Sequence, residues 1–322
     1  MDLLLLNPYF GLNFAEFVST LFFRTLHWFA QPFGAAPLEL APDELQLLIL
    51  FCLSGSTALI GTFLHLRKMA MLANSLSHTI VLGLALVFLG ESFFSGNLLQ
   101  LDGIGGLSFT ELMAAALVSA LFTSFLTHFL SDSLGIERDA SIGLVFSLLF
   151  ACGILLITLF ARNAHIGSEV IMGNLDSTSI GDLHNLFWIL IANGLYIAIF
   201  FKELLITTFD PTFARLLGYR LSCYHYGLMC FISLNCVNAF RAVGLLMLLA
   251  FFIIPPITAR LLVDRLIPMI AVAMGIGILA SFTGVGLARH FLSAYGLAFS
   301  TASLVVVILG LIFIITAIRA SK

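Results

Sequence analysis

The feature that most constrains this chain is a succession of apolar runs long enough, or nearly so, to cross a lipid bilayer. A helix needs about 20 apolar residues to span the hydrocarbon. Hydrophobic residues make up 61% of the 322 residues and charged residues only 10%, whereas a soluble domain carries roughly a quarter. Reading between charged and Gly/Pro/Asn-rich breaks gives about nine segments: 45–66, 74–90, 110–131, 140–160, 184–202, 222–240, 242–263, 267–289 and 296–318. We therefore expect an all-α, polytopic membrane helical bundle of 8–9 transmembrane helices.

The number of crossings depends on one pair of segments. Only the short sequence NAFRAVG separates 222–240 from 242–263. The pair is expected to form either two full crossings or one broken, re-entrant element. The first alternative gives nine crossings and the second gives eight.

The distribution of Lys and Arg predicts the orientation of the bundle. Of the 14 basic residues, three fall on one side, at Arg162, Arg241 and Arg289. A larger group falls on the other side: Arg67, Lys68, Arg138, Lys202, Arg215, Arg220, Arg260, Arg265, Arg319 and Lys322. Because basic residues are retained on the cytoplasmic side, the second side and the C-terminus are expected to be cytoplasmic. The net charge of −3 gives no indication of nucleic-acid binding.

The first 44 residues differ from the rest and are expected to form an N-terminal extension, with the membrane domain at 45–322. Along residues 14–29, polar residues recur at helical spacing and apolar residues fill the other face. The polar positions are Glu16, Thr20, Arg24 and His27. This pattern predicts an amphipathic helix lying in the membrane interface. A Pro-rich linker, 31–44, follows it.

A stretch on the predicted cytoplasmic side, FDPTFARLLG at 209–218, has the signals of a short, rigid helix. Asp210 can cap its N-terminus, Pro211 suits the first turn, and Gly218 can end it. Such a helix, held between two spans, is expected to be a docking device for a partner. The alternative is an ordinary interfacial loop helix.

This stretch resembles the FDPxFAxxLG-like segment of the ABC-type zinc/manganese/iron uptake permeases, the ABC-3 metal permease family. The matching positions are Phe209, Asp210, Pro211, Phe213, Ala214 and Gly218. Four further stretches match that family in the same order: 61–90, 137–156, 171–183 and 241–262. In that family the first segment couples the membrane domain to its ATPase, and the resemblance implies this role here.

The resemblance also implies a function and a set of partners. The chain would be the membrane-spanning subunit of an ATP-driven importer in the bacterial cytoplasmic (inner) membrane, moving Mn, Zn or Fe into the cytoplasm. Its partners would be a cytoplasmic ATP-binding subunit, a second permease subunit, an extracytoplasmic metal-binding protein and the membrane lipid, with no nucleic acid. The metal would be the substrate, and no cofactor would be bound permanently.

One ionisable residue, His78, lies just inside the apolar body of the second segment, where an imidazole is costly. Asn74 lies one helical turn earlier and on the same face. The resemblance implies a metal station here, because the family carries Asp-x-x-Ser-His at this point. Neutral imidazole is a good ligand for zinc, manganese or ferrous iron. Asn74, however, stands where the family usually has Asp, so the pair lacks the negative charge of that carboxylate.

Three interpretations of His78 remain open. In the first, His78 belongs to a weakened metal station that an anionic residue of a second, non-identical permease subunit completes. In the second, it is a gating or positioning residue without direct ligation. In the third, it is a helix-end histidine hydrogen-bonded to a neighbour. His128, with Ser124 and Asp132 at four-residue spacing, favours a structural hydrogen bond instead.

The source of energy is expected to lie outside this chain. The sequence contains no Gly-x-x-x-x-Gly-Lys-Ser/Thr motif, so we expect a transport subunit without an ATPase site of its own and not an enzyme. The alternative function is a gradient-driven secondary metal transporter, which usually needs several ionisable residues near the midplane. A third alternative, a non-transporting membrane assembly factor, would not explain the presence of His78 or of the 209–218 segment.

Overall fold

The computed structural model describes residues 8–9, 11–30, 40–95, 109–160, 175 and 178–320. Within these residues the regular structure is helical, and no strand occurs. Part of the matching stretch 171–183, the basic residue Arg162 and most of the Pro-rich linker lie outside the described part. The helices are α1 (Phe14–Ala30), α2 (Pro42–Leu66), α3 (Ala70–Ser95), α4 (Phe109–Ser133), α5 (Arg138–Phe160), α7 (Ile180–Ile199), α8 (Phe201–Phe209), α9 (Pro211–Leu216), α10 (Leu221–Val243), α11 (Leu245–Leu262), α12 (Leu266–Tyr295) and α13 (Thr301–Ala320).

Each of the apolar segments expected from the sequence corresponds to one long helix, which confirms the all-α prediction. In the described part of the chain, five helices are long and apolar enough to cross a membrane, namely α2, α5, α7, α12 and α13. Helices α4 and α11 contain shorter apolar stretches, Leu117–Ser131 and Leu246–Leu262. The exact number of crossings therefore stays a prediction.

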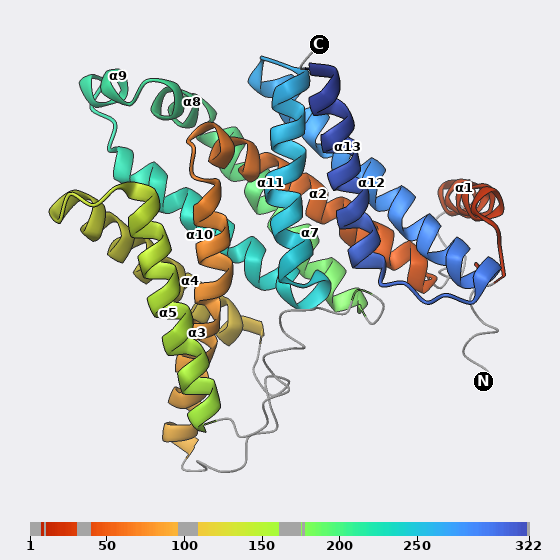
Figure 1. Cartoon of the computed structure of the whole chain (residues 1–322), viewed down its shortest axis with the longest axis horizontal. Helices are drawn as coiled ribbons and strands as arrows, with labels where there is room; N and C mark the ends of the chain where they lie inside the picture. Colours follow the sequence, from red (N-terminus) through yellow and green to blue (C-terminus); the bar gives the residue numbers. More distant parts are fainter. Residues whose placement is uncertain are drawn as a thin grey trace.

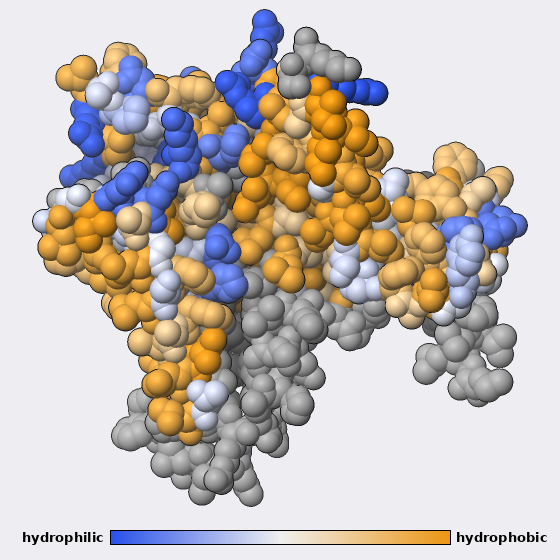
Figure 2. Space-filling model, in the orientation of Figure 1, coloured by the Kyte–Doolittle hydropathy of each residue, from blue (hydrophilic) through white to orange (hydrophobic). Residues whose placement is uncertain are grey.

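Helix α2 is the centre of the packing (Figure 1). It packs against α12, α7 and α11, while α3, α4 and α5 form a neighbouring group joined to the rest mainly through α10. Fully buried apolar residues along α2, including Leu53, Ile60 and Phe63, join the core that these helices share. Outward faces stay apolar, as Figure 2 shows over α11 and α13, which suits contact with lipid.

Helices α10 and α11 are separate elements that meet at Gly244. This residue has φ +85° and ψ 163°, a backbone conformation that favours glycine. The helices contain 23 and 18 residues, and Figure 1 shows α11 running back toward the end at which α10 begins. The break predicted near NAFRAVG is therefore a tight reversal between two helices.

Small residues let α12 approach its neighbours closely. A Cβ added at Gly284 would lie 2.4 Å from Val305 Cγ2 of α13, and one at Gly277 would lie 2.1 Å from Ser54 Oγ of α2. An added Cβ at Gly275, on the same helix, would meet no atom within 4 Å. Close approach through small residues is a common way to pack membrane helices.

Helix α1 and the residues before it contact the beginning of α2, which starts at Pro42 and so includes the last residues assigned to the N-terminal extension. Tyr9 donates a hydrogen bond to Glu44 Oε1 (2.6 Å), and Arg24 forms an ion pair with the same carboxylate (Nε–Oε1 2.5 Å). Phe17 is fully buried, whereas Phe22 and Phe23 are about two-thirds exposed (60% and 66%). The sequence pattern placed the apolar residues of 14–29 on a single face, whereas the structure buries Phe17 and leaves Phe22 exposed.

Candidate functional site

The segment predicted to dock a partner, 209–218, contains the short helix α9, which directly follows α8 at one end of the molecule (Figure 1). Asp210 caps α9, because its Oδ1 accepts a hydrogen bond from Phe213 N (2.9 Å) and another from Thr212 Oγ1 (2.5 Å). The backbone hydrogen bond from Phe213 is the main reason that the pKa of Asp210 lies below its ordinary value. Pro211 occupies the first turn, as predicted.

Helix α9 ends in a Schellman motif. Tyr219 N donates to Ala214 O and Gly218 N donates to Arg215 O, both at 3.0 Å. Gly218 has φ +84°, which glycine adopts without the steric cost of a side chain. The local expectation of a helix capped by Asp210 and ended by Gly218 is therefore confirmed.

The α8–α9 segment exposes large apolar side chains. Ala214 is fully buried beneath them, and the most exposed is Leu216, at 85%. The others are Phe209, Phe213 and Leu217, with 48–62% of their surface exposed. A rigid element with an apolar outer surface is suited to binding a partner protein.

Arg67 ties this segment to the turn between α2 and α3. Its guanidinium donates to Thr207 Oγ1 (2.8 Å) and Thr208 Oγ1 (3.0 Å), both on α8. Burial lowers the pKa of Arg67 from its ordinary value. Arg67 is the C-cap of α2, and α3 begins three residues later. Arg67 therefore connects α8 to the turn after which α3 begins.

Asn74 and His78 lie near the beginning of α3, and both are half-buried. The His78 ring faces α5, where its centroid lies 5.1 Å from those of Phe146 and Phe150. His78 Nδ1 is buried and has no hydrogen-bond partner among the described residues. If His78 is a helix-end histidine hydrogen-bonded to a neighbour through Nδ1, that neighbour is not among the described residues.

The described residues contain no group of three or more His, Cys, Asp or Glu side chains that could hold a metal ion. Asn74 and His78 would together supply one carbonyl oxygen and one imidazole nitrogen from this chain. Zinc commonly takes four protein or solvent ligands and manganese more oxygen ligands. The metal role of the pair stays a prediction that requires further donors.

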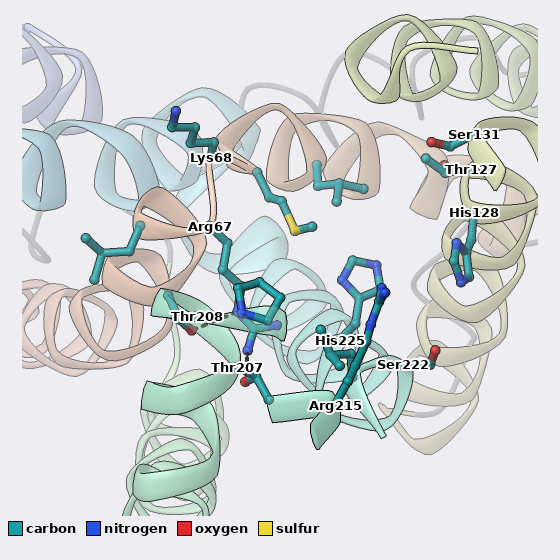
Figure 3. A pocket seen from close by; sticks show the side chains of 15 residues that line it. Arg67, Lys68, Thr127, His128, Ser131, Thr207, Thr208, Arg215, Ser222 and His225 are labelled. Atoms are coloured by element: carbon teal, nitrogen blue, oxygen red, sulfur yellow. Dashed lines mark hydrogen bonds between the residues drawn. The ribbon is translucent and has the colours of Figure 1, made fainter. Parts of the chain in front are cut away.

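A cavity of about 380 Å³ lies between the end of α2 and the α8–α9 segment (Figure 3). Its lining includes Arg67, Arg215 and the two imidazoles of His128 and His225. The sequence assigned no binding role to these histidines. Nothing in their local pattern reveals that α4 and α10 bring them to one cavity.

The model of the family described as "ABC 3 transport family" matches residues 46–320. A "Probable metal transport system membrane protein" of Chlamydia trachomatis serovar D is 36% identical over 312 residues, which are 96% of this chain and 93% of the relative. The "Manganese transport system membrane protein MntD" of Bacillus subtilis is 36% identical over 244 residues, 71% of this chain and 77% of the relative.

A solved structure has the same fold. It is described as "PsaBC from Streptococcus pneumoniae in complex with Fab", and it superposes with a TM-score of 0.67 at 28% sequence identity. The match covers 84% of this chain and 89% of the other.

Proposed function

Because this chain belongs to the ABC 3 transport family, we propose that it is the membrane-spanning subunit of an ATP-driven importer that moves a divalent transition metal into the cytoplasm. The names of the relatives, which specify metal or manganese transport, support the substrate class. The single observation that carries the proposal is the link from the exposed α8–α9 segment through Arg67 to the base of α3, the helix that bears His78.

The proposed mechanism uses this link to connect ATP binding with the ion path. A cytoplasmic ATP-binding subunit binds the apolar surface of α8–α9, and closure of two such subunits moves this segment. Arg67 passes the displacement to the first turn of α3. Because α3 rises about 1.5 Å per residue, His78 lies only some 12–13 Å along the helix axis from its beginning. The motion then switches access to the His78 region from one side of the membrane to the other.

The proposed location is the bacterial inner membrane, with α8–α9 and the C-terminus in the cytoplasm. The Lys and Arg distribution supports this orientation. In Figure 1 the C-terminal end of α13 and the α8–α9 segment lie at the same end of the molecule. An extracytoplasmic metal-binding protein would deliver the ion at the opposite end.

The proposed metal path has His78 and Asn74 as one transient station, with no permanently bound cofactor. A site lined by two copies of Asn74 would carry no fixed negative charge and would hold a dication poorly. We therefore infer a second, non-identical permease subunit that supplies a carboxylate. Binding must also stay weak enough for release, which a neutral ligand such as Asn74 favours.

Reconstitution tests the function directly. The chain, its ATP-binding subunit and any second permease are inserted into liposomes with the metal-binding protein outside, and uptake of radiolabelled manganese or zinc is measured. We expect uptake that requires ATP and disappears with an ATP-binding subunit unable to hydrolyse it. Uptake driven by a proton gradient without that subunit would contradict the proposal. Full uptake by a complex with only this permease would contradict the inference of a second, non-identical permease subunit, but not the import function.

A further inference from the structure

Helix α3 carries a second polar stripe beside the one that bears Asn74 and His78. Ser75 and Thr79 each follow one of these residues directly, so they lie about 100° further around the helix. Their side chains are buried, at 1% and 0% exposure, whereas Asn74 and His78 are half-buried. The second stripe therefore faces a neighbouring helix, and the contacts of Thr79 identify that helix as α4.

Thr79 is hydrogen-bonded to Thr123 of α4. Thr123 Oγ1 donates to Thr79 Oγ1 at 3.0 Å, and both side chains are fully buried. The bond joins two helices through residues 44 positions apart in the sequence. Because a hydroxyl in apolar surroundings costs free energy without a partner, such a pair favours one arrangement of the two helices over others.

One turn further along α3, the two helices come very close together. A Cβ added at Gly83 would lie 2.6 Å from Ala115 O and 2.9 Å from Ser119 Cβ. Moving along α3 from Thr79 to Gly83 corresponds to moving back one turn along α4, so the two helices are antiparallel. Because a backbone carbonyl cannot turn aside as a side chain can, this contact fixes the spacing of α3 and α4.

Helix α5 holds another side of the same segment. The His78 ring centroid lies 5.1 Å from those of Phe146 and Phe150. The contacts of Thr79 with α4 and of His78 with α5 therefore set the rotation of α3 about its own axis. A side-chain tip lies roughly 6 Å from a helix axis, so a rotation of about 10° would displace the imidazole by about 1 Å. A metal ligand must be held within about 0.5 Å of its productive position.

We propose that Thr79 and Thr123 are positioning residues for the metal station, because their hydrogen bond sets the rotation of α3 at which the His78 imidazole is oriented for ligation. The inference rests on the proposed function of His78 as a metal ligand. Without the bond, α3 samples other rotations, and the apparent metal affinity falls with the fraction of molecules that keep the productive one. A hydrogen bond between membrane helices changes such a population by roughly threefold.

The first measurement follows the orientation of α3 in the purified full chain, without metal or transport. Genetically encoded spin-label amino acids replace Met71 of α3 and Val118 of α4, both 63% exposed, which avoids labelling the five native cysteines. The antiparallel pairing places these sites about 20 Å apart along the helix axes, a separation that electron paramagnetic resonance resolves. Thr79→Val keeps the shape of the side chain but removes the hydroxyl, and it is expected to broaden the distance distribution. Thr79→Ser keeps the hydroxyl and should leave the distribution unchanged.

The second measurement is metal uptake by the reconstituted complex. We expect Thr79→Val to raise the metal concentration for half-maximal uptake by roughly threefold, with the maximal rate within about twofold of the wild type. Thr79→Ser should restore the wild-type value. Thr123→Val should act like Thr79→Val, and the double variant should be no worse than either single variant, because all three lose the same bond.

Ser75→Ala is the matched control. Ser75 lies one turn from Thr79 and is similarly buried, but its hydroxyl has no hydrogen-bond partner among the described residues. Its removal should change neither the distance distribution nor the half-maximal concentration. When Thr79 is replaced, Thr123 Oγ1 still has Ser119 O within reach at 2.7 Å. No buried donor is then left without an acceptor, so Thr79→Val is expected to fold.

Three results would overturn the positioning role. One is an unchanged distance distribution in Thr79→Val, and another is a broadened distribution with an unchanged half-maximal concentration. The third is an equal effect of Ser75→Ala, which would show general loosening of α3. His78→Ala, measured alongside, separates this inference from the station itself. If only His78→Ala changes the half-maximal concentration, the station stands and the positioning role fails. If neither variant changes it while uptake still requires ATP, the station fails and the positioning role fails with it.

Discussion

The surroundings of His78 leave one of its ring nitrogens open to a ligand. Its Nδ1 is buried without a hydrogen-bond partner in the described part of the chain, and two phenylalanine rings hold the imidazole in place. A buried polar atom without a partner costs free energy unless water or a ligand satisfies it. A transient metal ion would be one such ligand.

We expect His78→Ala to raise the metal concentration for half-maximal uptake by roughly tenfold, the scale on which altered ligation changes metal affinity. The measurement is uptake by cells at limiting and saturating metal, normalised to the amount of protein in the membrane. His290→Ala is the matched control, because His290 is also half-buried with an unsatisfied Nδ1 but lies on α12. Equal uptake by wild type and His78→Ala at every concentration would reject the station.

At the scale of elements, α8 and α9 form a preassembled unit suited to the proposed docking of the ATP-binding subunit. The cap at Asp210 and the Schellman motif at Gly218 fix both ends of α9, while its apolar side chains remain exposed. Because the unit needs no rearrangement to present these side chains, partner binding loses little conformational entropy.

Leu216→Glu is expected to abolish copurification of the ATP-binding subunit while leaving the amount of membrane-inserted chain unchanged. The reason is that Leu216 is 85% exposed and contributes little to the fold, but a buried carboxylate in the docked complex is costly. Leu262→Glu, at the end of α11 and 55% exposed, serves as the control. Normal copurification of Leu216→Glu would argue against docking at α9.

A second test at this scale concerns the contact between α12 and α13. Gly284→Val places new atoms within contact distance of Val305, so we expect a loss of about 1–3 kcal/mol in stability, typical of overpacking. Gly275→Val, on the same helix but facing open space, should change it by less than about 1 kcal/mol. Thermal unfolding in detergent measures both variants, and similar melting temperatures would contradict the observed packing.

At the scale of the whole molecule, one ion pair joins regions far apart in sequence. Arg289 of α12 donates to Asp43 of α2, 246 residues away, and the Arg289 Nε–Asp43 Oδ1 distance is 3.1 Å. The two side chains are 15% and 3% exposed. Together with the Arg24–Glu44 pair, this contact holds the beginning of α2 between α12 and the N-terminal extension.

Removing one charge of this pair leaves the other buried, so Asp43→Asn should lower the free energy of unfolding by about 3–5 kcal/mol. The Asp43→Asn/Arg289→Gln double variant should recover part of that loss, because no unpaired charge remains. Comparing melting temperatures of the single and double variants gives the coupling between the two residues. Purely additive losses would contradict the pairing.

Much of the fold could be predicted because its signals are local. Apolar runs set the positions of the helices, and Asp210, Pro211 and Gly218 set the ends of α9 within a few residues. The family assignment supports the ATP-driven prediction and not the gradient-driven alternative. The proposed roles of Asn74 and His78 remain to be tested by experiment.

Other features could not be predicted because they depend on which helices are neighbours. In the core, Ser56, Asn193 and Asn235 come from three helices and share hydrogen bonds, including Asn193 Nδ2 to Asn235 Oδ1 at 3.1 Å. The hydropathy of a segment does not show which of its residues face lipid and which face another helix, so these partners cannot be identified from it.

The sequence by itself therefore determined that this chain is a bundle of membrane helices with a short, capped helix between two of them. The tertiary structure decided that Arg67 joins α8, which precedes this helix, to the turn before α3, that His78 faces α5, and that Arg215 and His225 border one cavity. The physical reason is the separation in sequence of the residues that interact. Helix formation and capping depend on residues a few positions apart, whereas Arg67 and Thr207, 140 residues apart, meet only when the helices pack.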